Sequence, residues 1–556
     1  KIQYMKKYLL MSAIGVLPSV IMAQGATDAY QLSQPDFKGT ARFMSMGGAF
    51  GALGGDLSTL NQNPGGIGVY RGSEVGVTMD INMQKTEGAA GGMSFSEKQT
   101  KVYCNNFGYV GTARLGNSLM PTFSWGVSYS RAKSFDRVYS GRTPSMGASL
   151  SNYIARTMND MGLTSEDLGT VVDDRHPENN YDPYYDPMPG TRDSYAPWLG
   201  ILAYDSFLIS PNRDEVFHGL VTSADAEGSA SVFTREQGYV DEYSINFGGN
   251  FVNMVSWGIG FGITDINYTS DTWYDEDWRN ATIPVPHQDQ DGNTFYGTGT
   301  GNAYFDMYNH LHTYGTGFNM KLGVIVKPIN ELRIGLAVHT PTWYSLTSEY
   351  YADVDYRYSS GVVPDPKEPL PGTPYGSNSF NMKSPWRLIA SAAGVIGGRG
   401  IISMDYEYRG YDSMSLSDGY GAYEDANSDI KNYYKGTNTI RVGAEYRVTP
   451  SFSLRAGYNW TSSPVQQQAK NNGEIVYTSG TRPSYMWDNT TQYITCGLGY
   501  RYKGFYADAA YVHKHRTSTW HAFSPTVNQG ALIEGSPSVD VTDNNNSIVL
   551  SIGFKF

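Results

Sequence analysis

Cysteine is almost absent from this chain, since Cys104 and Cys496 are the only two among 556 residues. So few cysteines exclude a framework of several disulfides. Each falls in a segment with the alternation of a strand. By that alternation Cys104 points with Asn106, whereas Cys496 points with Ile494 and Leu498, which would be the opposite face. We therefore expect no disulfide between them.

Long apolar runs are also missing, because beyond the first 25 residues no stretch reaches the 18 residues of a transmembrane helix. The start has the parts of a secretory signal: basic Met5-Lys6-Lys7, an apolar run over 8–22 and the small residue Ala23. We predict a signal peptide at residues 1–23, with residues 1–4 ahead of the true initiator, and a mature chain that leaves the cytoplasm. A short anchor helix is the alternative, but the run is too short for it.

Charge and enzyme motifs are sparse as well. Only 17% of the residues are charged and the net charge is −12, which disfavours nucleic acid as a partner. The sequence has no Gly-x-Ser-x-Gly, no Walker loop and no His-Glu-x-x-His. His339 and His513 lie in or beside predicted strands without a paired nucleophile. We predict no enzymatic activity, no cofactor and no resident metal.

Glycine and tyrosine are abundant instead, with 63 and 44 residues, which favours many strands and turns. Over residues 74–83 the odd positions are apolar and the even positions are polar or glycine. A period of two predicts a strand with one apolar and one polar face. In a soluble sandwich the apolar face would meet a second sheet, whereas in an outer-membrane barrel it would meet lipid.

The same alternation recurs along the chain. The further predicted strands are 101–111, 122–131, 240–251, 257–268, 316–326, 332–358 with a kink at Pro341, 386–395, 401–409, 439–447, 452–459, 492–502, 505–514 and 547–556. Short connections alternate with long ones at 84–100, 132–239, 269–313, 359–384, 410–437, 460–490 and 515–546. Tight periplasmic turns alternating with long external loops are typical of a transmembrane barrel. The count predicts fourteen strands.

The C-terminal residue and the strand ends also have features of a transmembrane barrel. The last strand finishes at Phe556, like the C-terminal aromatic that directs barrels to their assembly machinery, although any edge strand can end in Phe. Tyrosines cluster near strand ends, as in the aromatic girdle at a lipid interface. We predict a multi-pass protein in the outer membrane of a Gram-negative bacterium, contacting outer-membrane lipid and acting as a monomer.

The longest external loop, 132–239, is not all coil. Residues 151–171 and 197–208 carry apolar side chains that favour helices. Such a segment could cover the barrel mouth, offer an apolar landing site, or simply pack on itself.

Residues 39–70 are too rich in glycine for a long helix and too apolar for a linker. We predict a compact segment with a helix capped by Asp56 over 57–60 and a stop and turn at Asn63-Pro64-Gly65-Gly66. Residues 24–38 are polar, and we expect them to be extended. A fourteen-stranded barrel is wide enough to need filling, and this segment is the natural filler.

Three features resemble the N-terminal hatch of the FadL/TodX family of outer-membrane transporters for long-chain fatty acids and hydrocarbons. They are Gly47-Gly48-Ala49, the Ala/Gly-rich run before Asp56, and the 63–66 turn, where Gly65 replaces the family's usual Ala. The resemblance implies an all-β fold: a 14-stranded antiparallel transmembrane β-barrel over 73–556, with residues 24–72 as the hatch inside the lumen.

The function that follows is passive uptake of hydrophobic molecules, long-chain fatty acids or similar, gated by the hatch. We expect ligand or hatch roles for one set of residues: Phe43, Met44, Met46, Phe50, Leu53, Asn63, Pro64 and Gly65. The resemblance also implies a lateral opening in the third strand, here at Ser124, Gly126 and Ser128 within 124–130, with Gly126 as the soft point. No energy-coupling box is visible, so an active siderophore-type receptor is not predicted.

Two alternatives stay open. One is a non-transporting barrel of the same family that serves as a secretion or shuttle partner for surface proteins. The other is a haem-binding receptor that uses the pairs His310/His312 and His513/His515, which share a face at strand spacing. The acidic loop clusters at 182–186 and 289–293 lack the spaced ligand set of a calcium loop, so we expect them to be solvated.

Overall fold

The computed structural model of the protein describes residues 24–116, 119–173, 175–288, 294–359, 370–471, 475–478, 480–528 and 531–556. The predicted signal peptide at 1–23 and the acidic cluster at 289–293 lie outside the described residues. Among the helices that are described, none is both long and apolar enough to cross a bilayer.

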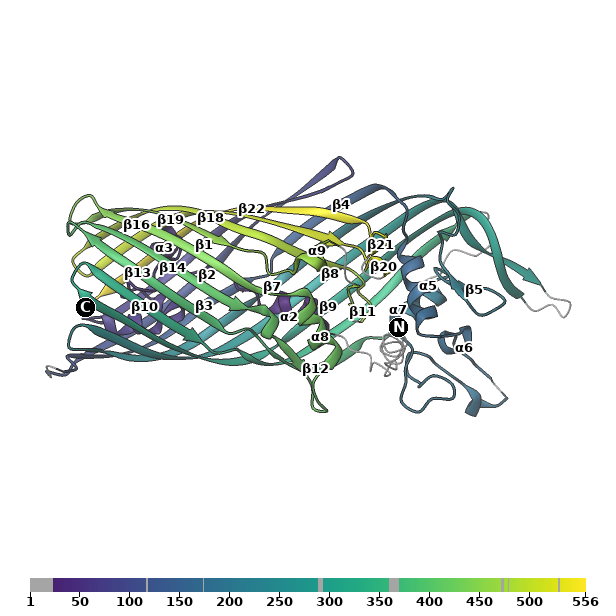
Figure 1. Ribbon diagram of the computed structural model, residues 1–556, viewed down its shortest axis with the longest axis horizontal. Coiled ribbons are helices and arrows are strands. Elements are labelled where there is room, and N and C mark those ends of the chain that lie inside the picture. Colours follow the sequence, from purple (N-terminus) through teal and green to yellow (C-terminus); the bar gives the residue numbers. More distant parts are fainter. Residues whose placement is uncertain are drawn as a thin grey trace, which may run out of the picture.

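Fourteen antiparallel strands close into one barrel, as the alternation predicts (Figure 1). Each strand pairs with its neighbours, and β1 pairs with both β2 and β22, which closes the cylinder. The strands are β1 (Glu74–Ala90), β2 (Met93–Arg114), β3 (Thr122–Ser134), β7 (Glu227–Phe251), β8 (Val255–Gln288), β9 (Thr294–Ile329), β10 (Leu332–His339), β13 (Arg387–Ile396), β14 (Gly400–Gly410), β16 (Gly436–Arg447), β17 (Phe452–Thr461), β18 (Tyr485–Tyr502), β19 (Phe505–His521) and β22 (Ser538–Lys555). After short breaks, four strands are extended by β4 (Arg137–Met146), β11 (Trp343–Tyr358), β12 (Gly376–Lys383) and β15 (Ser415–Ser417).

The predicted faces are confirmed. On β1 the side chains of Met79, Ile81 and Met83 are exposed, whereas Asp80 and Asn82 are buried toward the lumen. Apolar side chains are exposed at the outward positions of the other strands too, among them Ile245, Ile263, Leu336, Ile494 and Ile552. An apolar outer belt around a polar bore is the arrangement that a bilayer requires.

Both cysteines are free, as predicted, but the reasoning for Cys104 was wrong. The register of β1 and β2 shifts between Thr78 and Met79, and Asn105 and Asn106 are both buried. The extra residue in this bulge reverses the alternation, so Cys104 faces outward beside Val102. The two thiols therefore lie on the same outer surface, on strands that are not neighbours.

Several predicted loops are strands instead. Residues 84–100 form a hairpin in which β1 and β2 run on to a turn at Gly91-Gly92, and most of 269–313 belongs to β8 and β9. Beyond the membrane the two faces of a strand no longer separate lipid from lumen, so the apolar alternation fades while the hydrogen-bonded ladder continues. The pattern therefore marks the membrane-spanning parts and not the strand ends.

The predicted loop helices are present at the end with the long connections (Figure 1). They are α5 (Leu150–Asp160), α6 (Ser165–Leu168) and α7 (Trp198–Asp205). The remaining short elements are η2 (Pro177–Asn179), β5 (Ser210–Pro211), β6 (Phe217–His218), η4 (Tyr411–Ser413), α8 (Glu424–Tyr433), α9 (Gln467–Lys470), β20 (Thr526–Asn528) and β21 (Ala531–Glu534).

The N-terminal segment enters the barrel and forms α2 (Ala26–Ser33), α3 (Ala41–Ser45), α4 (Thr59–Gln62) and η1 (Pro64–Val69). The expectation of an extended stretch at 24–38 was wrong for α2. Four apolar residues on one side of this helix are buried in an apolar cluster of the lumen: Ala26, Ala29, Tyr30 and Leu32. Their helical periodicity extends over few residues and is interrupted by polar neighbours, so the sequence pattern did not indicate a helix. The helix expected after Asp56 begins later, at Thr59.

Candidate functional site

The hatch fills the bore near the end where the chain terminates (Figure 1). Five of the predicted residues, Phe43, Met44, Met46, Phe50 and Leu53, are at most 5% exposed. They pack against inward-facing wall residues: Ala393, Tyr493, Ala510, Val512 and Val549. In this structure these five side chains form one apolar contact between hatch and wall.

The wall meets the hatch with glycines. A Cβ built on Gly443 would lie 2.3 Å from the Met46 carbonyl oxygen, and one on Gly335 would lie 2.2 Å from the Gly51 oxygen. Gly248 and Gly497 face hatch side chains, those of Ile67 and Ser45. A Cβ on Gly258, Gly323 or Gly457 would, as at Gly443 and Gly335, meet hatch backbone within 2.8 Å. These contacts are shorter than any side chain allows, so the hatch backbone rests directly on the backbone of the wall.

The Asn63 side chain connects two parts of the hatch to each other and to the barrel wall. Its Nδ2 donates to the oxygens of Gly51 (2.6 Å) and Val324 (3.3 Å), and its Oδ1 accepts from the Gly65 N–H (2.9 Å). Pro64 then opens η1, where its missing N–H costs nothing. A Cβ on Gly65 would lie 2.8 Å from the Val324 nitrogen, which gives a local reason for glycine where the family has alanine.

Charged groups of the wall hold the rest of the hatch. Arg42 pairs with Glu445 at 2.9 Å, and Lys38 pairs with Asp80 at 2.5 Å. Asp405 Oδ2 accepts the N–H groups of Phe50 and Gly51 at 3.1 and 2.9 Å. These ties are polar and reversible, and they connect the segment to several strands at once.

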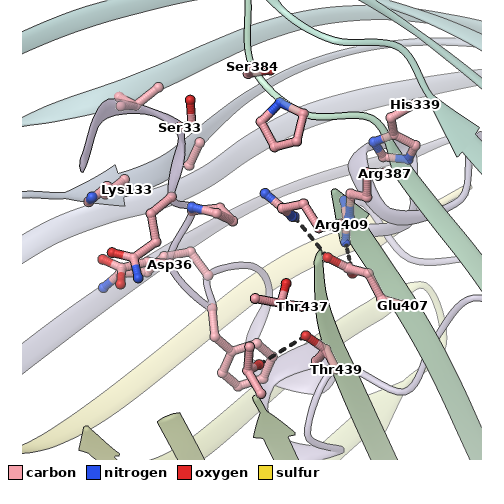
Figure 2. Close-up of a pocket in the computed structure, with 18 of the residues that line it drawn as sticks. Ser33, Asp36, Lys133, His339, Ser384, Arg387, Glu407, Arg409, Thr437 and Thr439 are labelled. Carbon is pink, nitrogen blue, oxygen red and sulfur yellow. Dashed lines mark hydrogen bonds and ion pairs between the residues drawn. The ribbon is translucent and has the colours of Figure 1, made fainter. Parts of the chain in front are cut away.

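Within the hatch lies a cavity of about 270 Å³, bounded by residues of α2 and α4 and by the barrel wall (Figure 2). Among the residues predicted for a ligand site, Phe43 borders this cavity. Met44 borders a smaller one of about 50 Å³ beside it. The larger cavity is lined by nine Lys and Arg residues but only four Asp and Glu residues. The lumen at this level is therefore cationic.

Three arginines meet one carboxylate at the wall of this cavity. Arg387 and Arg441 donate to Glu407 Oε2 at 2.7 and 2.8 Å, and Arg409 donates to Oε1 at 2.8 Å (Figure 2). Sequence reasoning missed these four residues. The sequence did contain an indication of them, because all four occupy inward positions of three adjacent strands. Burying a charged side chain there costs free energy unless the charge is paired.

The wall opens beside β2. Strands β2 and β3 pair from Arg114↔Thr122 to Asn106↔Ser130, and among the described residues their pairing goes no further. From Arg131 on, β3 and β4 stay with β7. Strand β4 crosses the inner face of β1, since a Cβ on Gly88 would lie 1.9 Å from the Ser140 oxygen.

The break is therefore displaced from the position expected for a lateral opening. Ser124, Gly126 and Ser128 are paired on both sides, with β2 and with β7. The register shift lies between Arg131 and Lys133 instead. Across the break, Tyr103 OH donates to Asp136 at 2.8 Å, and Lys101 lies 3.6 Å from the same carboxylate.

The far end of the barrel is capped. Helices α5 and α7 bury apolar side chains against the inward faces of the strand extensions, in a cluster with Trp278, Phe305 and Tyr358. Glu276 anchors this cap: its carboxylate accepts from Leu150 N (2.8 Å), Ser149 Oγ (2.6 Å), Tyr274 OH and Trp278 Nε1 (both 2.7 Å). Burial raises the pKa of Glu276 above its ordinary value.

The histidine pairs do not converge on a common centre. His310 Nδ1 lies 2.8 Å from Asp271, and His312 lies 3.6 Å from Glu349. His513 and His515 contact Asn546 and Asn544 of the adjacent strand at 3.0 and 2.9 Å. Within the described part of the chain, no group of three or more His, Cys, Asp or Glu side chains is arranged to hold a metal ion.

Comparison with solved structures finds barrels of similar extent but low similarity. A Pseudomonas aeruginosa FadL homologue is 14% identical, with a TM-score of 0.49, over 94% of this chain and 99% of that chain. The P. putida toluene transporter TodX is 12% identical, with a TM-score of 0.43, over 94% and 99%. The Ralstonia pickettii toluene transporter TbuX is 12% identical, with a TM-score of 0.41, over 94% and 100%. At these values the likeness carries no conclusion about function.

Comparison with curated proteins finds no match. The family model described as outer membrane protein transport protein (OMPP1/FadL/TodX) matches residues 298–475. This stretch contains Arg387, Glu407, Arg409 and Arg441 and lies apart from the hatch motifs. The resemblance of this chain to the OMPP1/FadL/TodX family, first indicated by residues 47–66, is thus confirmed by an independent part of the sequence.

Proposed function

We propose that the protein is an outer-membrane channel of a Gram-negative bacterium for the passive uptake of hydrophobic molecules, long-chain fatty acids or similar, with the hatch as its gate. The observation that carries this proposal is the pair of features at one level of the barrel. The hatch packs across the bore, while among the described residues no strand ladder joins β2 to β4. The family match over 298–475 supports a role in transport across the outer membrane.

The route we propose begins at the external loops. Apolar side chains are exposed there, with Val172 71% and Tyr185 66% exposed, and they offer a surface for capture. The apolar cluster under the cap then leads to the aromatic cluster around α2. Below it lies the charged ring, which is formed by Arg387, Glu407, Arg409 and Arg441. It disfavours further passage of an apolar chain, because burying apolar groups among ionised side chains gains little.

The exit we propose is lateral. At the level of the charged ring the wall is held across the break by side chains of Tyr103, Lys101 and Asp136 and not by a strand ladder. Separating these groups exposes a path from the lumen to the bilayer. The opening is therefore proposed at residues 131–136 against 101–105.

Gating by the hatch is tested by locking it. The Cβ of Gly51 would lie 3.0 Å from the Cβ of Ser391, which is about 0.5 Å closer than the Cβ atoms of a disulfide, so a bridge requires a small outward shift. A Gly51→Cys, Ser391→Cys variant in a Cys104→Ser, Cys496→Ser background would be assayed for uptake of labelled oleate by cells that lack other such channels. We expect uptake to fall to background when oxidised and to recover on reduction.

The cysteine-free background and each single cysteine variant serve as controls, and oxidant should leave their uptake unchanged. Equal uptake by locked and reduced barrels would refute gating by the hatch. Uptake no higher than in cells without the protein would refute the transport proposal itself.

The capped mouth favours a second candidate. With α5 and α7 packed over the strand extensions, the external end presents a folded surface, as expected for a barrel that serves a surface protein. In that case deletion of the gene would deplete proteins from the cell surface and leave oleate uptake unchanged.

We further propose that the barrel acts as a monomer and reaches the membrane through the barrel assembly machinery. Phe556 would supply the C-terminal signal, since it ends the closing strand and remains exposed. Native mass spectrometry and assembly of a Phe556→Ala variant test the two points separately.

A further inference from the structure

We propose that the outer face of the strand extensions binds carbohydrate, the uncharged hexoses of the glycolipid in the outer leaflet of the outer membrane. The site is a set of aromatic side chains, which we name the aromatic row: Phe233 of β7, Trp273 of β8, Tyr308 of β9, Tyr351 of β11 and Tyr375 ahead of β12. The proposal rests on the proposed location of the barrel in the outer membrane and is independent of transport through it.

Neighbouring rings of the aromatic row are in contact from end to end. The ring centroids of Phe233 and Trp273 are 5.6 Å apart, and those of Trp273 and Tyr308 are 4.9 Å apart. Tyr351 continues the contacts, at 5.5 Å from Tyr308 and 4.8 Å from Tyr375. The aromatic row therefore crosses four adjacent strands, and it ends at Tyr375, which is 67% exposed.

The aromatic row lies on the outer face of the sheet. Thr272 and Tyr274, the neighbours of Trp273 along β8, are buried on the inner face, and Tyr274 belongs to the cluster under the cap. Since alternate residues of a strand face opposite sides, Trp273 and its cross-strand partners Phe233 and Tyr308 point outward. Strands β8 and β9 run out past the cap helices at this end of the barrel (Figure 1). The aromatic row thus faces molecules beside the barrel and not molecules in its lumen.

A polar band separates the aromatic row from the apolar belt that faces lipid. On β8 the belt ends at the exposed side chain of Ile263. The outward residues between Ile263 and Trp273 are all polar: Asp265, Asn267, Thr269 and Asp271. The ten residues from 263 to 273 span about 33 Å along a strand, which is a rise of about 25 Å at a tilt of about 35–45°. An aromatic girdle lies at the edge of the belt, so the aromatic row is not part of one.

The height of the aromatic row identifies its partner. The headgroup region of a bilayer extends only about 5–8 Å beyond the hydrocarbon on each side, so a phospholipid does not reach the aromatic row. The outer leaflet of a Gram-negative outer membrane consists of a glycolipid whose sugar chain stands well above the hydrocarbon. These sugars lie beside the barrel at the level of Trp273, and we therefore assign the aromatic row to them and not to a soluble glycan.

The chemistry of the surface fits hexoses. A hexose ring has an apolar C–H face that packs on an aromatic ring, and hydroxyl groups at its rim that donate hydrogen bonds. Ionised carboxylates only accept hydrogen bonds, and they flank the aromatic row. Asp271 accepts from Tyr308 OH at 2.8 Å, Asp353 lies directly opposite Tyr308 on β11, and Asp275 faces outward beside Trp273. The same carboxylates repel phosphate groups, which favours an uncharged sugar over a phosphorylated one.

Stabilisation of the hairpin alone is the competing explanation, because aromatic pairs across strands strengthen a sheet. The two explanations differ for Tyr375, which lies outside the strands. Removing its ring leaves the ladder of β8, β9 and β11 unchanged, but it shortens a sugar-binding surface.

The experiment measures binding of a dephosphorylated core oligosaccharide of lipopolysaccharide to the full barrel in phosphatidylcholine nanodiscs by calorimetry. Wild type is compared with Trp273→Ala, Tyr308→Ala and Tyr375→Ala. Tyr420→Ala is the matched control, since it removes an exposed tyrosine from another long connection. Heat-modified migration on gels confirms that each variant is folded, and hydrogen exchange of β8 and β9 reports on the ladder.

We expect Trp273→Ala and Tyr308→Ala each to weaken oligosaccharide binding about fivefold, and Tyr375→Ala to weaken it about twofold, because each removes one stacking surface. Tyr420→Ala should bind like wild type, and calcium or EDTA should change nothing.

A second measurement tests the membrane glycolipid as the source of the sugar. Native mass spectrometry should find more lipopolysaccharide on wild type purified from cells than on Trp273→Ala. The difference should vanish in cells whose lipopolysaccharide lacks the core hexoses. If the difference persists in those cells, the assignment to these sugars is wrong.

Three results would overturn the proposal. The first is equal binding, or none, by wild type and Trp273→Ala. The second is binding that requires calcium, which would assign the face to a cation that bridges phosphate to the carboxylates. The third is faster exchange of β8 and β9 in Trp273→Ala while Tyr375→Ala binds like wild type, which would leave only a structural role. Oleate uptake by cells is read separately, so this proposal and the transport proposal fail independently.

Discussion

Gly443 of β16 lies so close to Met46 of the hatch that an added Cβ would stand 2.3 Å from the Met46 carbonyl oxygen. The neighbour is backbone and cannot rotate away. A methyl group at this position must therefore displace the hatch or distort the wall, at a cost of about 1–3 kcal/mol.

We predict that Gly443→Ala makes the barrel leaky. Ion conductance in planar bilayers should rise above the wild-type level, and cells should become more sensitive to large antibiotics. Gly394→Ala is the matched control, because a Cβ at Gly394 meets nothing within 4 Å. Equal conductance of the two variants would show that the hatch does not seal the bore.

The Asn63 side chain offers a second test of how the hatch is held. Asn63→Ala removes two donated bonds and one accepted bond, and it leaves the Gly51 oxygen without a buried partner. We expect a loss of about 1–3 kcal/mol of local stability. Hydrogen exchange of residues 50–66 should accelerate by at least tenfold.

The control for Asn63→Ala is Asn302→Ala, which changes an exposed residue on β9. It should leave exchange in the hatch unchanged. Unchanged exchange in Asn63→Ala would mean that the packing of Phe50 and Leu53 alone fixes the turn.

The barrel could be predicted from the sequence because lipid imposes one rule on every strand. Val75 to Met83 shows it: each outward residue must be apolar, and each inward residue is free to be polar. The count of fourteen followed from that rule and from the alternation of connection lengths. Outside the membrane the rule lapses, which is why β8 and β9 run about twenty residues beyond their predicted ends.

The site was predicted in part. The hatch segment was recognised because its glycines and apolar residues fit no regular element, and Asn63 was found as a turn residue. Its contacts could not be found: that Gly443 faces Met46, or that Arg387 faces Gln62, depends on the register between segments hundreds of residues apart. The alternation of apolar and polar residues predicts on which face of the sheet a side chain lies. It does not predict the position of that side chain along the barrel axis.

The break in strand pairing lies away from Gly126 for a related reason. Gly126 is a flexible residue by composition, but its neighbours on both sides are paired, so it stays within the ladder. The bulge at Arg131/Lys133 carries no glycine or proline. It lies where the chain leaves β2 and β4 crosses over β1, which is a tertiary arrangement that the local sequence does not display.

The anchor of the cap gives a third prediction. Glu276 accepts four hydrogen bonds in a buried site. Glu276→Ala would remove the acceptor of Leu150 N–H, Tyr274 OH and Trp278 Nε1, whereas Ser149 Oγ could still bond to Ser151 Oγ. We expect the cap to open locally, with a loss of about 3 kcal/mol or more. Limited proteolysis should then cut within residues 147–165.

Glu276→Gln should lie between wild type and Glu276→Ala, because the amide keeps the shape but accepts fewer bonds. Glu424→Ala, a change at an exposed residue of α8, is the control. Protease resistance of Glu276→Ala equal to wild type would show that the apolar cluster holds the cap without this carboxylate.

Three aspartates give the last prediction, which concerns pH. Asp306 on the outer face of β9 lies directly opposite Asp275 of β8 and Asp355 of β11, in the part of the strands beyond the predicted membrane segment. Burial, followed by the charges of Asp275 and Asp355, raises the pKa of Asp306 to about 6. In the unfolded chain it would titrate near 3.8, so between these two values the folded state holds the extra proton.

The stability of this hairpin should therefore fall as pH rises from about 4 to about 6 and stay constant above that. After allowance for solvent screening we expect a change of about 1 kcal/mol. Hydrogen exchange of β8 and β9, corrected for the intrinsic rate at each pH, measures it. Asp306→Asn should reduce the pH dependence and protect the hairpin at pH 7, and a remainder is expected because burial also raises the pKa of Asp275. Asp412→Asn at an exposed position should change neither. Persistence of the same pH dependence in Asp306→Asn would assign the proton to another group of the row.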